Sequence, residues 1–212
     1  MMRVREPRFW TALVVMGLSV FTIARSITLL RFGLEELVVD RSSPAAVLTP
    51  FEADPAIGYL ARRDALALDR GENAKEKAAA ASALLTATPL SGAVWLDLAR
   101  ARLGAGEGMA KVAGALVMSD LTVPNEARVM AARAVFGLPL WALSTPEARK
   151  SLVADLVGGW DETTVAERQA LRAVFRAARA ERREAVRAGL LLLGKEAAPI
   201  AGALGLEPPP AR

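Results

Sequence analysis

The segment Gly189-Leu-Leu-Leu-Leu-Gly194-Lys195-Glu196 is the nearest match in this sequence to a catalytic motif, the phosphate-binding loop G-x-x-x-x-G-K-[ST]. Glu196 stands where that motif has a hydroxyl group for magnesium, and its carboxylate would repel phosphate. No strand pattern precedes the segment, although the motif lies between a strand and a helix. We therefore expect an apolar helix that ends at a glycine and no bound nucleotide. Gly104-x-Gly106-x-Gly108 also lacks a preceding strand and is predicted to be a turn between helices.

The residue types that are missing exclude most catalytic mechanisms. The chain has no histidine and no cysteine, which rules out Ser-His-Asp triads, thiol nucleophiles, imidazole zinc sites and disulfides. Two carboxylate pairs, Glu35 with Glu36 and Glu181 with Glu184, could perform acid–base work on a glycoside. The first pair falls in a connecting segment and the second shares a helix with arginines, which is typical of solvated carboxylates. We expect no catalytic residue, no cofactor and no metal site, and therefore no enzyme.

Arginines recur along the helix expected near the carboxyl end. Thr164-x-x-Glu167 has capping-box spacing and predicts one long helix that continues past residue 187. Six arginines follow at steps of 4, 4, 3, 4 and 4 residues, within one sector of about 100° beside an apolar face. A solvated face has this pattern, and so does a surface that binds lipid headgroups, an acidic protein or an acidic glycan. This arginine stripe consists of Arg168, Arg172, Arg176, Arg179, Arg183 and Arg187.

An apolar segment near the amino terminus is long enough to cross a membrane. Residues 1–8 are basic, and residues 9–30 span 22 positions, or about 33 Å as a helix. Arg25 lies near the end of this segment, so its side chain can snorkel to the headgroups. A cleaved signal peptide that ends at Thr22-Ile23-Ala24 is the alternative to an uncleaved anchor. The basic residues that precede the segment are Arg3, Arg5 and Arg8.

These basic residues predict a topology. Positive charges ahead of an apolar helix stay in the cytoplasm. We therefore expect a cytoplasmic tail over residues 1–8, a single inner-membrane helix over residues 9–30, and a carboxyl-terminal domain on the periplasmic side.

The remainder of the sequence is punctuated as a series of helices, with almost no strand pattern. Residues 31–53 are predicted to be a tether and residues 207–212 a proline-rich tail. Residues 54–206 carry repeated helix-start signals, in which a capping residue is followed by proline or by Glu three positions later. The predicted fold is all-α, with one transmembrane helix followed by a domain of helical hairpins. The signals stand at Asp54-Pro55, Asn73-x-x-Glu76, Ser91, Pro124-Asn125-Glu126, Thr145-Pro146 and Thr164-x-x-Glu167.

The helix starts recur every 34–36 residues, near Pro55, Ser91, Asn125 and Asp161. In the second unit, Trp95-x-x-Leu98-Ala99 is similar to the W-x-x-L-G signature of the tetratricopeptide repeat family. The chain resembles this family over residues 55–190 in period, although the other units keep the length without the signature.

The resemblance implies a particular arrangement of helices. It places Trp95, Leu98 and Ala99 between antiparallel helices, in a curved stack whose concave face binds a peptide or protein and performs no catalysis. Arg102 stands where the family has an aromatic residue, and Arg133 lies one period after Ala99. An irregular helical bundle with coincidental spacing is the alternative.

These features predict a membrane-anchored, periplasm-facing scaffold or adaptor that binds a protein partner in a cell-envelope machine. Surface polysaccharide assembly or export is one setting and protein translocation another. A small structural subunit of an inner-membrane complex, held through its transmembrane helix, is the first alternative. A glycan-binding or carboxylate-dependent hydrolytic domain is the second. Nucleic acid is not expected, because the net charge is only +4 and the domain is predicted to be exported.

Overall fold

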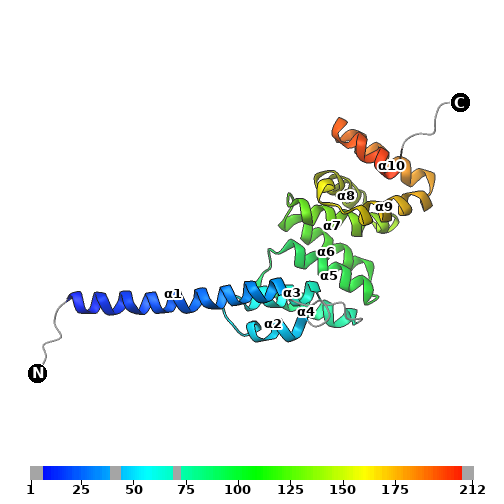
Figure 1. Ribbon diagram of the computed structural model, residues 1–212. Coiled ribbons are helices and arrows are strands. Elements are labelled where there is room, and N and C mark those ends of the chain that lie inside the picture. The colour runs from blue at the N-terminus through cyan, green and yellow to red at the C-terminus, as the bar shows by residue number, and fades with distance from the viewer. Residues whose placement is uncertain (1–6, 39–43, 69–72, 207–212) are drawn as a thin grey trace, which may run out of the picture. The chain divides into compact units, whose positions relative to one another are not determined.

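The computed structural model describes residues 7–38, 44–68 and 73–206. Every regular element in these ranges is a helix, which confirms the all-α prediction (Figure 1). The predicted tail 207–212 lies outside the described residues, as do Arg3 and Arg5. The chain divides into two compact units, residues 1–70 and 71–212, so the division falls after the expected start of the helical domain at residue 54.

The first unit contains α1 (Pro7–Val38), α2 (Pro44–Glu52) and α3 (Gly58–Leu68). Within α1, Phe9–Glu35 contains an 18-residue stretch with a mean hydropathy of 2.0 and no buried residue, so this helix is long and apolar enough to cross a membrane. A signal sequence has the same properties. The prediction of a tether over residues 31–53 is wrong for the described residues, because α1 continues to Val38 and α2 lies wholly within that range.

A small core holds α2 and α3 against α1. The rings of Phe32 and Phe51 meet edge-on, with their centroids 5.4 Å apart, and are buried together with Leu48, Ile57 and Ala61. These contacts explain why the residues after Phe32 stay helical. Pro44 is compatible with α2 because it occupies the first position of that helix, where no intrahelical N–H donor is required.

Arg25 takes a different position from the one expected. Its Nη1 donates to both carboxylate oxygens of Asp54, at 3.0 and 2.8 Å, instead of reaching alone toward headgroups. Asp54 also accepts a hydrogen bond from the backbone N–H of Ala56 at 2.8 Å. The charge of Arg25 is therefore paired within the first unit.

The second unit is a series of helices that follow one another in short hairpins (Figure 1). The α-helices begin where the capping signals predict. Asn73 accepts from the backbone N–H of Glu76, Thr145 from that of Ala148, and Thr164 forms a complete capping box with Glu167. The elements are α4 (Ala74–Ala87), α5 (Gly92–Gly104), α6 (Met109–Thr122), α7 (Ala127–Gly137), the 3-10 turn η1 (Leu138–Leu143), α8 (Pro146–Gly158), η2 (Trp160–Glu162), α9 (Val165–Ala177), α10 (Ala180–Leu192), η3 (Lys195–Ala197) and α11 (Ala198–Leu204).

Helix α5 lies at the centre of the first hairpins and packs against α4, α6 and α7, while α7 packs against α8. From Gly92 through Ala127 to Val165, alternate helices begin 35 and 38 residues apart. The intervening helices α6, α8 and α10 begin 37 and 34 residues apart. The two-helix spacing seen in the sequence is therefore present in the fold.

The larger core of the second unit is built by the helices that follow α6. Leu156, Leu171, Phe175 and Leu190 are almost completely buried there, and Trp141 from η1 packs with them. Gly159 shows how tightly α8 and η2 approach α7, because a Cβ at this position would lie 2.2 Å from the backbone nitrogen of Ala131. This close packing fixes α7 and α8 side by side.

Candidate functional site

The arginine stripe does not lie on one continuous helix. α9 ends at Ala177 and α10 begins at Ala180, with extended backbone at Ala178 and Arg179. The prediction of a single helix through residue 187 is therefore wrong. No glycine or proline marks the bend, which instead allows α9 to pack on α11 while α10 packs on α8.

The six arginines also differ in their surroundings. Arg168 lies over the Trp160 ring, 4.5 Å from its centroid, and donates to the Trp160 carbonyl at 2.8 Å. Arg172 donates to the backbone carbonyl of Ala203 at 2.7 Å. Arg187 forms an ion pair with Glu184 at 2.6 Å.

The other three, Arg176, Arg179 and Arg183, are exposed and form no ion pair with a residue that the structure describes. They divide between the end of α9, the bend and α10. The stripe is therefore reduced to three unpaired arginines around a bend.

The three residues expected to pack between repeats differ in how deeply they are buried. Leu98 and Ala99 are buried in α5, at 1% and 0% exposure. Trp95 is only half-buried, and its Nε1 donates to the backbone carbonyl of Pro89 at 2.8 Å. The expectation that Trp95 is enclosed between helices is thus too strong, because this hydrogen bond holds the indole at the surface between α4 and α5.

The segment that resembles a phosphate-binding loop is the end of a helix, as expected. α10 ends at Leu192 and Gly194 has φ +108°, which favours glycine. Of its four leucines only Leu190 is buried. The turn predicted at Gly104 to Gly108 is also present, between α5 and α6.

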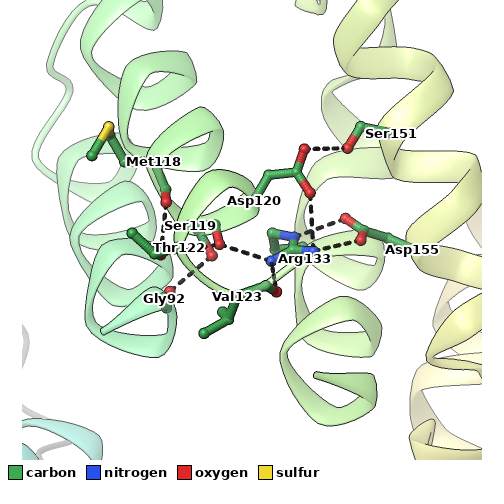
Figure 2. Close-up of polar contacts among 9 residues, drawn as sticks. All are labelled: Gly92, Met118, Ser119, Asp120, Thr122, Val123, Arg133, Ser151 and Asp155. Carbon is green, nitrogen blue, oxygen red and sulfur yellow. Dashed lines mark hydrogen bonds and ion pairs between the residues drawn. The ribbon is translucent and has the colours of Figure 1, made fainter. Parts of the chain in front are cut away.

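Sequence reasoning missed the most highly connected polar side chain in the second unit, Arg133 of α7. Its guanidinium is 1% exposed and lies between α6 and α8 (Figure 2). Nε donates to Asp155 at 2.8 Å and Nη2 to the other oxygen of that carboxylate at 2.6 Å. Nη1 donates to the carbonyls of Ser119 and Val123 at 3.0 and 3.2 Å. Nη2 also forms an ion pair with Asp120 at 3.2 Å, so Arg133 donates four hydrogen bonds and contacts a second carboxylate.

The network continues from Arg133 into three neighbouring helices. Ser151 of α8 donates to the second oxygen of Asp120 at 2.7 Å (Figure 2). Ser119 of α6 donates to the carbonyl of Gly92, at the start of α5, at 2.8 Å. The hydrogen-bond network around this buried arginine thus connects α5, α6, α7 and α8.

Burial controls the electrostatics of this network. Loss of solvent raises the pKa of the Asp155 carboxyl, and the hydrogen bonds from Arg133 act against that effect. The negative charge of Asp120 raises the pKa further. One sequence signal was available, since Arg133 occupies the place one period after the small, buried Ala99. An arginine at such a core position requires a buried acidic partner, but spacing alone does not identify Asp155.

An open cavity of about 260 Å³ lies beside this network, between α6, η1 and α8. We call it the α6–α8 groove. Its polar floor is formed by Asp120, Arg133, Ser151 and Asp155. Its walls are mostly apolar, and two of their side chains, Val117 and Leu143, are 50% and 62% exposed. The apolar wall residues are Met109, Ala113, Leu116, Val117, Leu140, Leu143, Ala148 and Leu152.

The groove has the features of a binding site. Apolar walls with a few fixed polar groups are typical of sites that take a ligand or a peptide side chain. Among the described residues, no group of three acidic side chains is placed to hold a metal ion. The carboxylates of Glu181 and Glu184, for which the sequence predicts a solvated helix face, do not line the groove, and Glu184 is paired with Arg187.

Comparison of the chain with protein-family models, with curated proteins and with solved structures finds no match. The fold and the groove together define an all-helical protein with a long apolar amino-terminal helix and a surface groove.

Proposed function

We propose that this protein is a membrane-anchored scaffold whose helical domain binds a segment of a partner protein in the α6–α8 groove. The observation that carries the proposal is the groove itself. It exposes large apolar side chains on a floor where Arg133 is held by four hydrogen bonds and by ion pairs with Asp155 and Asp120. A preorganised floor and apolar walls favour binding, because little side-chain freedom is lost when a partner segment enters.

The membrane part of the proposal is supported by α1. Its apolar length exceeds what a bilayer core requires, and its most apolar 18-residue stretch contains no buried residue. Together with the arginines that precede it in the sequence, this length favours an uncleaved inner-membrane anchor with the helical domain in the periplasm. The two-helix spacing and the buried Leu98 and Ala99 support a tetratricopeptide-like mode of partner binding. A cell-envelope machine, for surface polysaccharide export or protein translocation, is the setting we favour.

The orientation can be tested with the full chain. A phosphatase that folds only outside the cytoplasm, fused after Leu206, should be active in intact cells because the domain is exported. A fluorescent reporter that folds only in the cytoplasm should be dark at the same position. The reverse pattern would overturn the topology and, with it, the periplasmic setting.

The scaffold role can be tested by photo-crosslinking in native membranes. A photoreactive residue at Leu143, in the groove wall, should capture a specific protein partner, whereas one at Leu90 should not. Leu90 is a matched control because it is also a highly exposed leucine of the second unit and does not line the groove. Capture at Leu143 should be lost when Val117 is replaced with Asp.

A third crosslinker position separates the scaffold from its rival. Leu18 lies in the exposed apolar part of α1. If Leu18 captures the partner and Leu143 does not, the protein is a small subunit held through its transmembrane helix. Equal capture at Leu143 and Leu90 would also reject the groove as the binding site.

A further inference from the structure

The charges around the α6–α8 groove are unbalanced. The groove is lined by three carboxylates, Asp120, Glu147 and Asp155, and by one guanidinium, that of Arg133. Arg133 is buried and its bidentate partner is Asp155, so this pair is neutral as a unit. Asp120 and Glu147 remain, and all the other lining residues are uncharged. The groove therefore presents a net negative charge next to apolar walls.

Both remaining carboxylates can accept further hydrogen bonds. Asp120 is 37% exposed and receives one contact at each oxygen, from Arg133 and from Ser151. A carboxylate has about four lone-pair sites, so about two remain available at Asp120. Glu147 is exposed in the first turn of α8 and forms no ion pair with a described residue. A cation that enters the groove would find two carboxylates with acceptor capacity.

The size of the groove determines the apolar part of an occupant. An apolar cavity of about 150 Å³ accepts a benzene molecule. At about 260 Å³, the groove can take one side chain of the size of leucine or phenylalanine and part of a neighbour. Lipid phosphates and acidic glycans do not fit this site, because Asp120 and Glu147 would repel them.

We infer that the α6–α8 groove binds a partner segment that carries a large apolar side chain and, close to it in sequence, a lysine or arginine. The apolar side chain contacts Val117, Leu140 and Leu143, and the cation pairs with Asp120 and Glu147. This inference rests on the proposed function and adds the chemistry of the partner. The groove therefore selects a basic partner segment, whereas the arginine stripe would select an acidic one.

The test uses a phage-displayed library of random dodecapeptides, selected against the full chain in detergent. Selected peptides should be enriched in sequences that combine Lys or Arg with a large apolar residue. One such peptide, labelled with a fluorophore, should bind about 2- to 5-fold more weakly to the Glu147→Gln variant, the range for a partly exposed ion pair. Replacing its cation with norleucine should weaken binding by at least the same factor, because the pairing with Asp120 is lost too, and should abolish the difference between the two proteins. Binding to the wild-type chain should weaken as salt is added.

A matched control is available in α10. Glu181→Gln changes an exposed glutamate in the first turn of a helix of equal length, but this residue does not line the groove. It should bind the peptide as the wild type does. Glu147→Gln removes no internal contact, and an unchanged circular dichroism spectrum would verify that it folds.

The outcomes separate the two proposals. Selection of no peptide, or of peptides that bind Leu143→Asp as well as the wild type, rejects the groove and the proposed function with it. Peptides that need Leu143, lack basic residues and bind Glu147→Gln normally reject this inference alone. Displacement of the peptide by a second copy of the chain, seen as a concentration-dependent dimer, would also overturn it.

Discussion

Replacing Arg133 with Met should destabilise the second unit more than most single substitutions can. The change leaves Asp155 with its carboxylate 4% exposed and without its bidentate partner. Removal of one member of a buried ion pair costs about 3–5 kcal/mol. The Val123 carbonyl also loses its donor Arg133, whereas the Ser119 carbonyl keeps its hydrogen bond from the backbone N–H of Val123 at 3.2 Å. We expect the free energy of unfolding at pH 7 to fall by about 3–5 kcal/mol.

The measurement is urea unfolding of the full chain in detergent. It should be followed by tryptophan fluorescence, because three of the four tryptophans lie in the second unit. The double variant Arg133→Met, Asp155→Leu should recover much of the loss, since a buried ion pair can be replaced by apolar side chains at little cost. Arg128→Met is the control. Its side chain is 87% exposed and only 4.0 Å from Glu162, so the change should cost less than about 1 kcal/mol.

The pH dependence gives a second readout of the same perturbation. Without Arg133, burial and the negative charge of Asp120 raise the pKa of Asp155 in the folded state with no opposing hydrogen bond from an arginine, and the unfolded state keeps the ordinary value. The destabilisation of the Arg133→Met variant should therefore shrink as the pH falls through that raised pKa, because the native carboxyl takes up a proton. A loss below about 1 kcal/mol at pH 7, or a double variant no more stable than the single one, would refute the reasoning.

The remaining predictions concern packing and charge elsewhere in the second unit. Gly159→Ala should lower the free energy of unfolding by about 1–3 kcal/mol, because the added Cβ meets the backbone of Ala131. Gly114→Ala, at an open position within α6, should raise it by about 0.5–1 kcal/mol in the same urea assay. Burial raises the pKa of Asp97, with Arg100 opposing, so its native carboxyl binds a proton more readily than the unfolded one. Stability should thus decline as the pH rises from about 3.8 through the raised pKa, and Asp97→Asn should remove this slope. A slope of the opposite sign, or equal stability of the two glycine variants, would contradict these assignments.

Local signals predicted the helices well. The capping residues Asn73, Thr145 and Thr164 have side chains that accept the expected backbone hydrogen bonds, because a cap and its acceptor lie within one turn. The long apolar helix was also predictable, since its length and composition need no tertiary information. The turn at Gly106 was predictable from its glycine, because this residue has a φ of 72°, which glycine adopts without strain.

Features set by contacts between distant residues were not predictable from local pattern. The bend at Ala178 has no glycine or proline, and the arginine periodicity continues through it unchanged. Residues 31–53 contain proline and serine, yet Phe32 and Phe51 pack together and make most of the described part helical. Arg133 and Asp155 are 22 positions apart, and their pairing depends on α7 lying beside α8.

The ion pair between Arg25 and Asp54 bears on how α1 would sit in a bilayer. Arg25 and Phe32 are seven positions apart, so they share one side of the helix, and both contact residues of α2 or the turn that follows it. On this side the apolar surface without protein neighbours covers residues 9–24, about 24 Å. On the other side, exposed apolar residues continue to Leu34 and Leu37, about 38 and 42 Å along the helix axis from Phe9. A helix with sides of unequal hydrophobic length accommodates a core of about 30 Å by tilting. In the proposed topology α1 is therefore inclined to the membrane normal, and the side that carries α2 and α3 leaves the hydrocarbon first.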